Sequence, residues 1–502
     1  MVAAAVARVV VVHPAEAAEA VGRPRGDMVQ EAAAGDGRFV ATGGPYRQYE
    51  RRVRSRPDGR IEETVEFTLA IPVWSFLFVW PFKLAFGRPL HRRSTSPWWA
   101  PPARIDPRAS GVLGLLCTMA IVGGYLGTLI TQTLTFATDE FGNESTTSQS
   151  SALATVRAGV LLAIVLAALA DRAGRRRALT IAAVAGCLVT ATGAFVPNLG
   201  WLVVSQTVAR GFATALLLLI AIVSAEEMPA GARAYAYSLM TMTAALGAGM
   251  CLWALPLADL GERWWRALYV IPLLFLPLIA VVMRRLPESK RFAVEHVEAP
   301  LAGHGRRFWL LASAGALLAV FAAPVSQLQN EFLKDERGFS ASRIALFTVA
   351  TATPGVIGIV VGGRWADVHG RRLVAAIGIT GGVVFTLAQF AADGWPMWAW
   401  SVAGSILAGL TVPALGVYRP ELFPTSLRGR AGGVIEGVTV AGSAAGLLIV
   451  GALVDGGRSY ASAFAMIAAA PLAIAVLVLV AFPETAQREL EELNPEDLAA
   501  TP

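Results

Sequence analysis

The chain has 502 residues, of which 55% are hydrophobic and only 16% are charged, and its mean hydropathy is +0.56. A soluble protein usually carries about 25% charged residues, and here the apolar residues form unbroken runs of about 20, the length that crosses a bilayer. The composition excludes an ordinary soluble domain and predicts a multi-pass protein of the lipid bilayer. The net charge of +6 does not indicate a nucleic-acid partner, because Lys and Arg cluster beside the apolar runs, where they set topology.

Residues 1–63 are rich in Ala, Gly and Arg and show no sustained apolar period, which predicts a mostly disordered cytoplasmic arm. Residues 64–109 are predicted to form an apolar segment followed by a linker. The core of that segment, Phe67–Phe86, is aromatic, but two prolines and Lys83 interrupt it and basic residues flank both ends. A membrane span normally has its basic residues on one side, so an interfacial or re-entrant segment is favoured over a span, which stays open as the alternative.

Twelve apolar runs of membrane-spanning length follow, six within residues 110–290 and six within residues 308–485. Residues 291–307 form a basic connector, and residues 486–502 form an acidic tail. The loops on one side collect arginines and those on the other collect Asp and Glu, which predicts a cell-membrane protein whose connector and two termini are cytoplasmic. The predicted spans are Gly111–Ala137, Ser151–Ala170, Ala178–Val196, Trp201–Ser224, Ala234–Leu257, Ala267–Met283, Phe308–Gln329, Ile344–Val361, Leu373–Phe390, Met397–Tyr418, Ala431–Val454 and Ala461–Phe482.

Four landmarks of the first half return in the second half at a nearly constant separation. The charged turns after the second and eighth spans, for example, lie 196 residues apart, and each contains an Asp, a Gly and two Arg. Such a repeat predicts two six-helix halves related by pseudo-symmetry, with a solute site between them near the midplane. The repeated segments are Asp139–Gly142 and Asp335–Gly338, Asp171–Arg176 and Asp367–Arg372, Glu226–Arg233 and Glu421–Arg428, and Pro287–Ser289 and Pro483–Thr485.

The turn after the second span resembles the signature loop of the major facilitator superfamily of secondary transporters, Gly-x-x-x-Asp-Arg-x-Gly-Arg-Arg. The first copy has Ala167 in place of the opening Gly, and the second copy has Val368 in place of an Arg. The two Pro-Glu-Ser/Thr segments and Glu421–Gly429 are similar to the sugar and metabolite symporter branches. The resemblance implies an all-α polytopic membrane protein with twelve transmembrane helices in two pseudo-symmetric halves, plus the N-terminal extension. It also implies a monomeric transporter rather than an enzyme.

The two charged turns, together with the repeated Glu and Arg residues, are predicted to form a cytoplasmic gate. An Asp at a helix end can accept hydrogen bonds from a neighbouring helix N-terminus or pair with an Arg, and such contacts can release when helices rock apart. We expect Glu226 to pair with Arg233, and Glu421 to pair with Arg428. The alternative, that the arginines only fix topology, stays open. The predicted gate residues are Asp171, Arg172, Gly174, Arg175, Arg176, Glu226, Arg233, Gly363, Asp367, Gly370, Arg371, Arg372, Glu421 and Arg428.

Ionisable residues inside the spans are the candidates for substrate binding, because each costs a few kcal/mol at the bilayer centre unless it faces a partner or water. They are Arg157, Arg210 and Glu436, and Arg210 resembles an arginine that the superfamily carries in the middle of its fourth helix. Glu436 shares a helix face with Thr439 and Ser443. For each charge, a buried pair or a side chain that extends to the headgroups is the alternative. The polar residues Thr131, Gln132, Gln327 and Asn330, on the first and seventh spans, are further candidates that could line the cavity.

The eleventh span contains two pairs of glycines that are each four residues apart, Gly433 with Gly437 and Gly442 with Gly446. Gly247 occupies the position in the fifth span that corresponds to Gly442. Small residues at this spacing let helices approach closely. We expect packing inside one bundle rather than dimerisation of two chains.

The function predicted from these features is secondary active transport of a small polar organic solute, such as a sugar or a carboxylate, by alternating access. Ion-coupled symport is favoured over uniport or efflux, and a membrane sensor that does not transport is the alternative outside transport. Proton or sodium coupling is possible, and Glu436 is the best proton carrier because the first span has no carboxylate. No cofactor or metal is expected, since the sequence has no metal-ligand cluster and no His inside any span. The solute, the direction and the coupling ion stay open.

Overall fold

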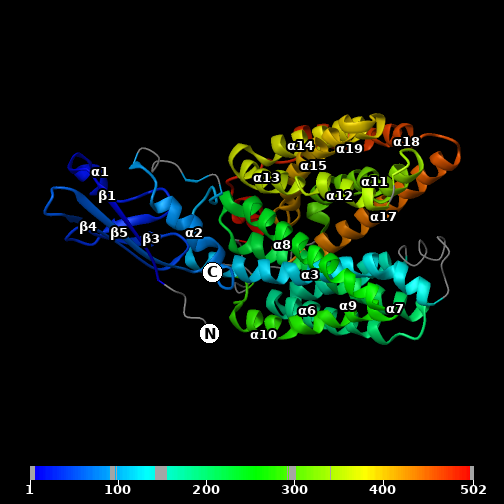
Figure 1. Cartoon of the computed structure of the whole chain (residues 1–502), viewed down its shortest axis with the longest axis horizontal. Coiled ribbons are helices and arrows are strands. Elements are labelled where there is room, and N and C mark those ends of the chain that lie inside the picture. Colours follow the sequence, from blue (N-terminus) through cyan, green and yellow to red (C-terminus); the bar gives the residue numbers. More distant parts are fainter. Residues whose placement is uncertain are drawn as a thin grey trace. The chain divides into compact units, whose positions relative to one another are not determined.

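The chain divides into two compact units, residues Met1–Thr118 and Met119–Pro502, and each is treated separately below. The computed structural model in Figure 1 shows a sheet with short helices in the first unit and long helices in the second. The structure describes residues 6–90, 96–97, 99–141, 155–290, 292, 301–339 and 341–497.

The first unit is built on a five-stranded antiparallel sheet with the strand order β1-β5-β4-β3-β2. The alternation of buried and less buried residues in the first and third strands, and the tight turns at Asp36-Gly37 and Asp58-Gly59, favour strands that pair as hairpins. Helix α1 (Ala18–Val21) follows the first strand. The strands are β1 (Ala7–His13), β2 (Gln30–Ala33), β3 (Arg38–Gly43), β4 (Tyr46–Ser55) and β5 (Ile61–Leu69).

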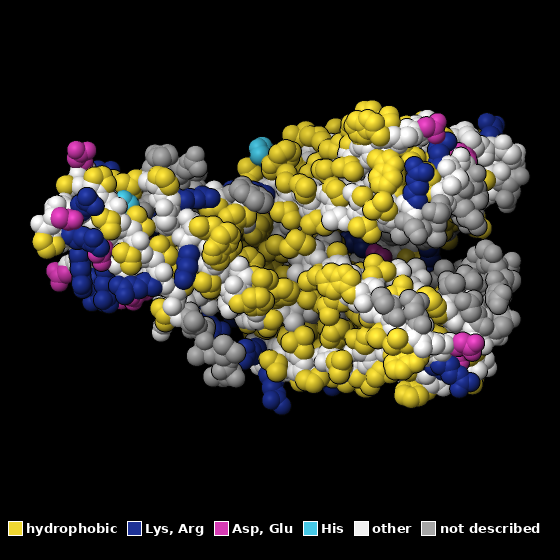
Figure 2. Space-filling view, in the orientation of Figure 1, with side chains coloured by type: hydrophobic (Ala, Val, Ile, Leu, Met, Phe, Trp, Pro, Cys, Tyr) yellow, Lys and Arg dark blue, Asp and Glu magenta, His cyan; other side chains and the backbone are white. Residues whose placement is uncertain are grey.

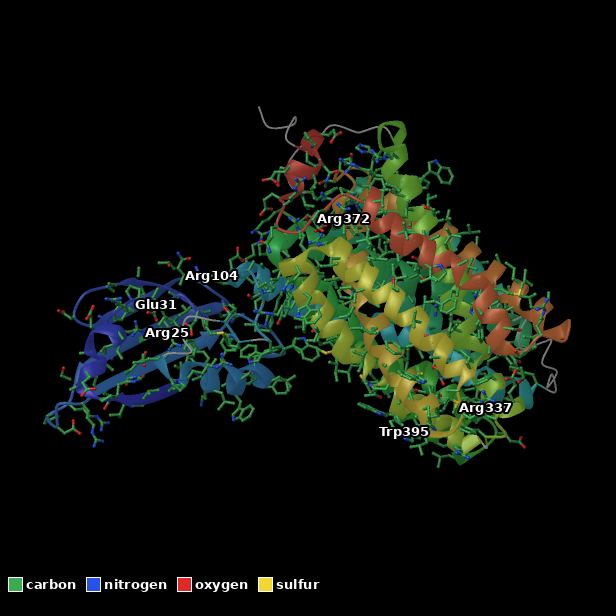
Figure 3. The ribbon with its side chains drawn as sticks, turned by 90° about the horizontal axis from the view of Figure 1, so that it is seen from above. Arg25, Glu31, Arg104, Arg337, Arg372 and Trp395 are labelled. Carbon is green, nitrogen blue, oxygen red and sulfur yellow. The ribbon has the colours of Figure 1, made fainter. Side chains whose placement is uncertain are left out.

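The prediction of a disordered arm, which rested on the richness in Ala, Gly and Arg, does not hold for residues 6–63, because these residues form the sheet unit. Several charged residues are buried and paired inside the sheet unit instead of being solvated. The Arg51 guanidinium is fully buried and pairs with Glu31 at 2.6 Å and with Glu63 at 3.4 Å. The Arg25 backbone N–H donates to Glu31 at 2.8 Å, and Figure 3 shows these two residues next to each other.

The apolar segment Phe67–Phe86 does not form one helix. It begins in β5 and continues as α2 (Ser75–Phe86), a helix of 12 residues. At 1.5 Å per residue such a helix is about 18 Å long, which is too short to cross a hydrocarbon core of about 30 Å. The alternative of a transmembrane helix is thereby excluded for this segment, and Phe82 and Phe86 pack instead against aromatic side chains of the sheet.

Long apolar helices make up the remainder of the chain, as predicted. Eleven helices in the described residues are long and apolar enough to cross a membrane. The second predicted span is shorter in the described part, where a turn at Arg157–Gly159 leads into a helix of 14 residues, and residues 151–154 lie outside the description. The extension makes the chain mixed α and β, while the membrane part is all-α, with two halves of six spans.

The helices of the first half are α3 (Pro107–Glu140), α5 (Val160–Ala173), α6 (Arg175–Thr192), α7 (Leu199–Glu227), α8 (Arg233–Ala254), α9 (Ala267–Val270) and α10 (Leu276–Arg285). The helices of the second half are α11 (Gly305–Asp335), α12 (Ala341–Ala352), α13 (Gly355–His369), α14 (Arg371–Ala391), α15 (Gly394–Gly416), α16 (Tyr418–Glu421), α17 (Arg428–Asp455), α18 (Tyr460–Ile467) and α19 (Ala469–Ala481). The short helix α20 (Leu490–Leu493) lies in the acidic tail.

The two halves meet through pairs of helices that the internal symmetry relates. Helix α5 packs on α17, and helix α13 packs on α8, so that a helix of each half lies against a helix of the other. In Figure 1, α6, α7, α9 and α10 lie in one layer, and α13, α14, α15 and α19 lie in the other. This arrangement leaves the faces of α3, α7, α8 and α17 available for a site between the halves.

The repeated glycines permit close helix crossings inside the chain, as predicted. A Cβ atom on Gly442 or Gly446 would overlap a backbone carbonyl of α11, at Ala316 and Val320 respectively. A Cβ atom on Gly247 would overlap the Ile121 carbonyl of α3. The same contact is therefore made in both halves, where the fifth and eleventh spans cross the first and seventh.

Substitution of Gly446 by Ala should destabilise the protein, because the added methyl group has no space against the Val320 carbonyl. Overpacking of this kind costs roughly 1–3 kcal/mol. The matched control is Gly451→Ala on the same helix, where nothing lies within 4 Å of the new Cβ. Thermal unfolding in detergent should show a lower Tm for Gly446→Ala alone, and equal Tm values for the two variants would contradict the assigned crossing.

Candidate functional site

The two charged turns have the same backbone conformation. Gly174 joins α5 to α6 with φ +100°, and Gly370 joins α13 to α14 with φ +96°. Side chains disfavour this left-handed region, and a Cβ atom on either glycine would also lie 2.8 Å from a carboxylate oxygen, of Glu288 or Glu484. The predicted role of Gly174 in reversing the chain agrees with the structure.

Each of the two aspartates caps a helix of the opposite half. Asp171 accepts hydrogen bonds from the backbone N–H groups of Gly429, at 2.9 Å, and Arg430, at 2.8 Å, in the first turn of α17. Asp367 accepts equivalent bonds from the first turn of α8, at 3.2 Å from Ala234 and 2.9 Å from Tyr235. A carboxylate at a helix N-terminus satisfies free N–H groups and interacts favourably with the helix dipole. These bonds link the two halves at one end of the bundle, hereafter the charged-turn end.

An arginine one turn after each aspartate extends the contact. Arg175 pairs with Asp171 at 2.7 Å and donates to the Thr425 carbonyl of the second half at 2.6 Å. Arg371 pairs with Asp367 at 3.3 Å and donates to the Thr485 hydroxyl at 2.9 Å. Both guanidinium groups are almost completely buried, so they do more than mark topology.

The glutamates pair across the halves, and the prediction of pairs within each repeat is wrong. Glu226 pairs with Arg428 at 2.9 Å, and Glu421 pairs with Arg233 at 3.5 Å. Each glutamate also contacts the arginine of its nearer charged turn, Glu226 with Arg175 and Glu421 with Arg371. The residues Asp171, Arg175, Glu226, Arg233, Asp367, Arg371, Glu421 and Arg428 are hereafter called the gate cluster.

The Pro-Glu-Ser/Thr segments have a structural role that the sequence analysis did not assign. The Glu288 carboxylate accepts hydrogen bonds from the backbone N–H groups of Arg175 and Arg176, at 2.9 and 3.1 Å. Glu484 does the same for Arg371 and Arg372, at 3.0 and 3.2 Å. The signal was present in the sequence, because both segments repeat at the same separation as the charged turns.

The remaining predicted gate residues lie at the edges of this cluster. Arg172 is exposed and takes part in none of the ion pairs of the gate cluster. Arg176 donates from its side chain to the Met283 carbonyl at 2.8 and 3.0 Å. Gly363 allows α13 to approach α8, because a Cβ atom there would lie 2.8 Å from the Ala234 carbonyl.

A cavity of about 500 Å³ lies between the halves, directly behind the gate cluster. Arg428, a member of the cluster, also lines the cavity, so the cluster adjoins the cavity at this residue. A smaller cavity of about 190 Å³ shares Arg210, Thr214 and Glu436 with the larger one. Figure 2 shows a hollow between the two helical layers in which charged side chains are visible.

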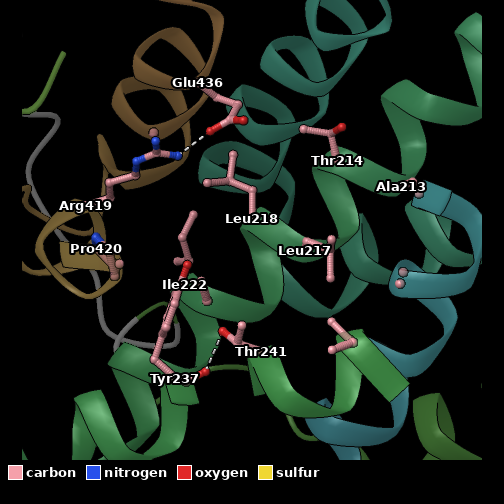
Figure 4. Close-up of a pocket in the computed structure, with 18 of the residues that line it drawn as sticks. Ala213, Thr214, Leu217, Leu218, Ile222, Tyr237, Thr241, Arg419, Pro420 and Glu436 are labelled. Atoms are coloured by element: carbon pink, nitrogen blue, oxygen red, sulfur yellow. Dashed lines mark hydrogen bonds and ion pairs between the residues drawn. The ribbon is translucent and has the colours of Figure 1, made fainter. Parts of the chain in front are cut away.

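Charged side chains give the cavity its chemical character. Glu436 is the one carboxylate among the described residues that line it, and it forms an ion pair with Arg419 of α16. Figure 4 shows this pair on the cavity wall opposite Thr214. Arg157 donates to the Ser443 hydroxyl at 2.7 Å, and Arg210 donates to the Gly127 carbonyl. Neither of these two arginines has a carboxylate partner among the residues that the structure describes.

The predicted polar residues of the first and seventh spans are not part of this lining. Gly127 and Thr128 line the cavity from α3, whereas Thr131, one turn further along, is exposed, and Gln132 is half-buried outside the lining. Gln327 is exposed on α11, and the Asn330 side chain lies outside the described residues. Of the three predicted charges, in contrast, Arg210 and Glu436 line both cavities and Arg157 lines the smaller one.

Arg419 is a cavity residue that the sequence analysis missed. The predicted tenth span ends at Tyr418, one residue before Arg419. In the structure α16 continues the span, so that Arg419 reaches Glu436, and also Thr439 at 3.4 Å. The sequence contained one signal for this residue, namely its position as a single charge between an apolar run and the repeated Glu421 segment.

The fold and the site define a membrane transporter of two pseudo-symmetric helical halves with a central cavity. The model of the family "Major Facilitator Superfamily" matches residues 111–329 and 310–500, and the chain belongs to this family. This confirms the resemblance found in the sequence. The family and its fold are those of transporters rather than enzymes.

Relatives and solved structures are similar to this chain to different extents. The proton:xylose symporter XylE, bound to 6-bromo-6-deoxy-D-glucose, aligns with a TM-score of 0.63 at 18% identity, over 76% of this chain and 98% of that chain. The human organic anion transporter MFSD10 (TETRAN) aligns with a TM-score of 0.60 at 14% identity, over 73% and 98%. At these sequence identities, the two structural alignments support a similar fold and nothing further. The puromycin resistance protein pur8 of Streptomyces alboniger is 32% identical over 178 residues, which is 34% of this chain and about a third (35%) of that protein.

Proposed function

We propose that this protein is a secondary active transporter that moves a small organic anion across the cell membrane by alternating access. The observation that carries the proposal is the pair of cavity arginines, Arg157 and Arg210, which have no carboxylate partner in the described structure and lie above a closed gate. Of the solutes predicted from the sequence, sugars and carboxylates, we therefore favour the anionic ones.

The gate cluster supports alternating access. Its helix caps and ion pairs join the two halves at the charged-turn end, which we place in the cytoplasm together with both termini. A buried ion pair contributes little net stability, since desolvation offsets much of the attraction. Contacts of this kind can close one side firmly and still be exchanged for hydration when the halves rock apart. The structure then represents the state in which the cavity is closed toward the cytoplasm.

The charge of the cavity supports an anionic solute. The described lining holds one carboxylate, Glu436, which forms its ion pair with Arg419, while Arg157 and Arg210 add two further positive charges, so this membrane-embedded site carries an excess of positive charge. An unpaired charge at this depth costs a few kcal/mol, and a bound carboxylate or phosphate would offset that cost. Guanidinium groups suit such ligands because their N–H donors match two oxygen atoms at once. The cavity volume is within the range of small-molecule sites.

For coupling, Glu436 remains our candidate, because it is the carboxylate of the described lining. Its protonation would release Arg419, and the pair therefore offers a route by which a proton could change the charge of the cavity. Proton-coupled symport is the leading mode, and exchange or efflux of the same anion is the alternative. We propose that the monomer is the transporting unit.

Counterflow in proteoliposomes tests the function. Vesicles that contain the purified protein are loaded with an excess of one unlabelled solute, and entry of the same solute in labelled form is measured. The panel contains carboxylates, phosphate esters, neutral sugars and puromycin. We expect transient accumulation for at least one anion and none for neutral sugars.

Saturable binding of an anion without counterflow would contradict transport and indicate a sensor. Counterflow confined to sugars or to puromycin would retain the transporter and contradict the anionic class. In the same vesicles, an imposed proton gradient should drive net accumulation of the anion if symport is correct, and failure to do so would exclude proton coupling.

A further inference from the structure

Helix α2 has apolar side chains on two opposite faces. The inner face packs on the sheet, where Phe86 lies 5.2 Å from Phe67 and Phe82 lies 5.9 Å from Tyr46, measured between ring centroids. Both phenylalanines are buried. This face completes the aromatic core of the first unit and explains why the helix forms there.

The outer face of α2 is apolar and uncovered by any described residue. Its side chains Phe76, Leu77, Trp80 and Leu84 are 71%, 51%, 68% and 54% exposed. At 3.6 residues per turn these four positions fall on one side of the helix. Four large exposed apolar side chains on one short helix are unusual for a surface in contact with water and indicate an interaction site.

The start of α2 is attached to the first membrane span within the same compact unit. The Trp74 indole N–H donates to the Gly114 carbonyl and to the Thr118 hydroxyl of α3, both at 3.0 Å. A Cβ atom on Gly114 would lie 3.2 Å from Pro72, so the segment before α2 packs directly on this part of α3. Gly114 and Thr118 lie about two and three turns into α3, a helix that is apolar enough to cross the membrane.

These contacts determine the depth of α2. At 1.5 Å per residue, Gly114 and Thr118 lie about 10 and 16 Å along α3 from its first residue. If α3 begins in the headgroup layer, these residues lie within one leaflet, and α2, which starts one residue after Trp74, begins in that leaflet. Exposed tryptophan is favoured at the level of the headgroups, where its ring is partly apolar and its N–H can be hydrated. Lys83 is half-buried on the edge of the same outer face, which allows its charged end to reach lipid phosphates.

We propose that the outer face of α2 inserts into the headgroup region of the leaflet in which α3 begins, and holds the sheet of the first unit against the membrane surface. The partner is lipid, and the proposal does not depend on the solute or on the direction of transport. A helix of 12 residues is long enough to lie in the interface although it is too short to cross the bilayer. The sequence predicted an interfacial segment, and the proposal now specifies that the outer face of α2 contacts the lipid.

Site-directed spin labelling of the full-length protein in lipid nanodiscs tests this proposal. Single cysteines are introduced as Leu77→Cys or Trp80→Cys, after the buried native cysteines Cys117, Cys187 and Cys251 have been replaced by alanine. The matched control is Val10→Cys on β1, an apolar side chain of the same unit that is 46% exposed. Collision of the nitroxide with oxygen, which concentrates in lipid, is compared with collision with a water-soluble nickel chelate.

We expect both α2 labels to favour oxygen several-fold over the control label, which should favour the nickel chelate. Equal access of the nickel chelate to positions 80 and 10 would overturn the proposal, because the face would then be in water. A label at position 80 that is immobile and protected from both reagents would also overturn it, in favour of a protein partner. Dipolar broadening that disappears on dilution with unlabelled protein would identify that partner as a second copy of the chain.

Discussion

Replacing Arg210 with glutamine is expected to weaken binding of the anionic solute roughly 100-fold, or about 3 kcal/mol, within the range found when one member of a desolvated charge pair is removed. Arg210 borders both cavities, and its guanidinium is held by the Gly127 carbonyl with no carboxylate partner in the described structure. The glutamine keeps a donor for Gly127 but loses the charge that the anion requires. Thermal-shift titration of purified protein, followed by counterflow with the same anion, measures the effect.

Two variants separate charge from structure in this test. Arg210→Lys keeps the charge and should retain part of the affinity, although lysine cannot bind two oxygens at once in the same geometry. Arg306→Gln removes an exposed charge at the start of α11 and should leave binding unchanged. If the anion stabilises wild type and Arg210→Gln equally, Arg210 is not in the site, while the proposal of transport itself would stand.

The charged residues of the cavity could be identified from the sequence, because a charge inside a membrane span has a high free-energy cost and is therefore rare. Arg157, Arg210 and Glu436 stand alone in apolar runs, and all three line one or both cavities. Arg419 escaped because the boundary of a span is uncertain by about one turn, and a charge just outside it looks like an ordinary loop residue. The partners of each charge depend on which helices meet, and this information is not contained in the spacing of residues along one helix.

The N-terminal sheet shows a different limit. Composition indicated disorder because Ala, Gly and Arg are abundant, yet Arg51 is fully buried and pairs with the buried carboxylates of Glu31 and Glu63. The local signals were better than the composition, since Asp58-Gly59 separates two alternating segments, the typical pattern of a hairpin. Side chains along a strand alternate between the two faces of the sheet, and the face decides whether a charged side chain is solvated or buried and paired. The amino-acid composition of a segment does not contain this information.

The pairing in the gate cluster could not be derived from the repeat, for a reason of symmetry. Two copies that each contain a Glu and an Arg allow two equally symmetric arrangements, with pairs inside each copy or crossed between copies. The sequence is identical in both cases. The structure has the crossed arrangement, which makes each pair a contact between the halves, as the proposed gate requires.

Double-mutant cycles should reproduce the crossed arrangement. Glu226→Gln removes one buried carboxylate from both Arg428 and Arg175, which keep Asp497 and Asp171 as partners. Breaking a buried pair costs up to about 3–5 kcal/mol in the state that contains it. Combined with Arg428→Gln, the loss should be smaller than the sum of the single losses, with a coupling of about 0.5–3 kcal/mol. Combined with Arg233→Gln, the losses should add to within about 0.5 kcal/mol, because Glu226 forms no ion pair with that arginine in the described structure.

The same variant should also open the cytoplasmic side of the cavity. A shift of about 3 kcal/mol changes the ratio of two conformations roughly 100-fold. Ala221 lines the cavity and can be replaced by cysteine as a probe. This cysteine should react much faster with a membrane-impermeant thiol reagent added at the charged-turn end. Arg172→Gln removes a charge from the same turn without removing an ion pair of the gate cluster and should leave this rate unchanged. Unchanged labelling in Glu226→Gln, or coupling of Glu226 to Arg233 instead of Arg428, would contradict a gate made of crossed pairs and leave these charges with a purely structural role.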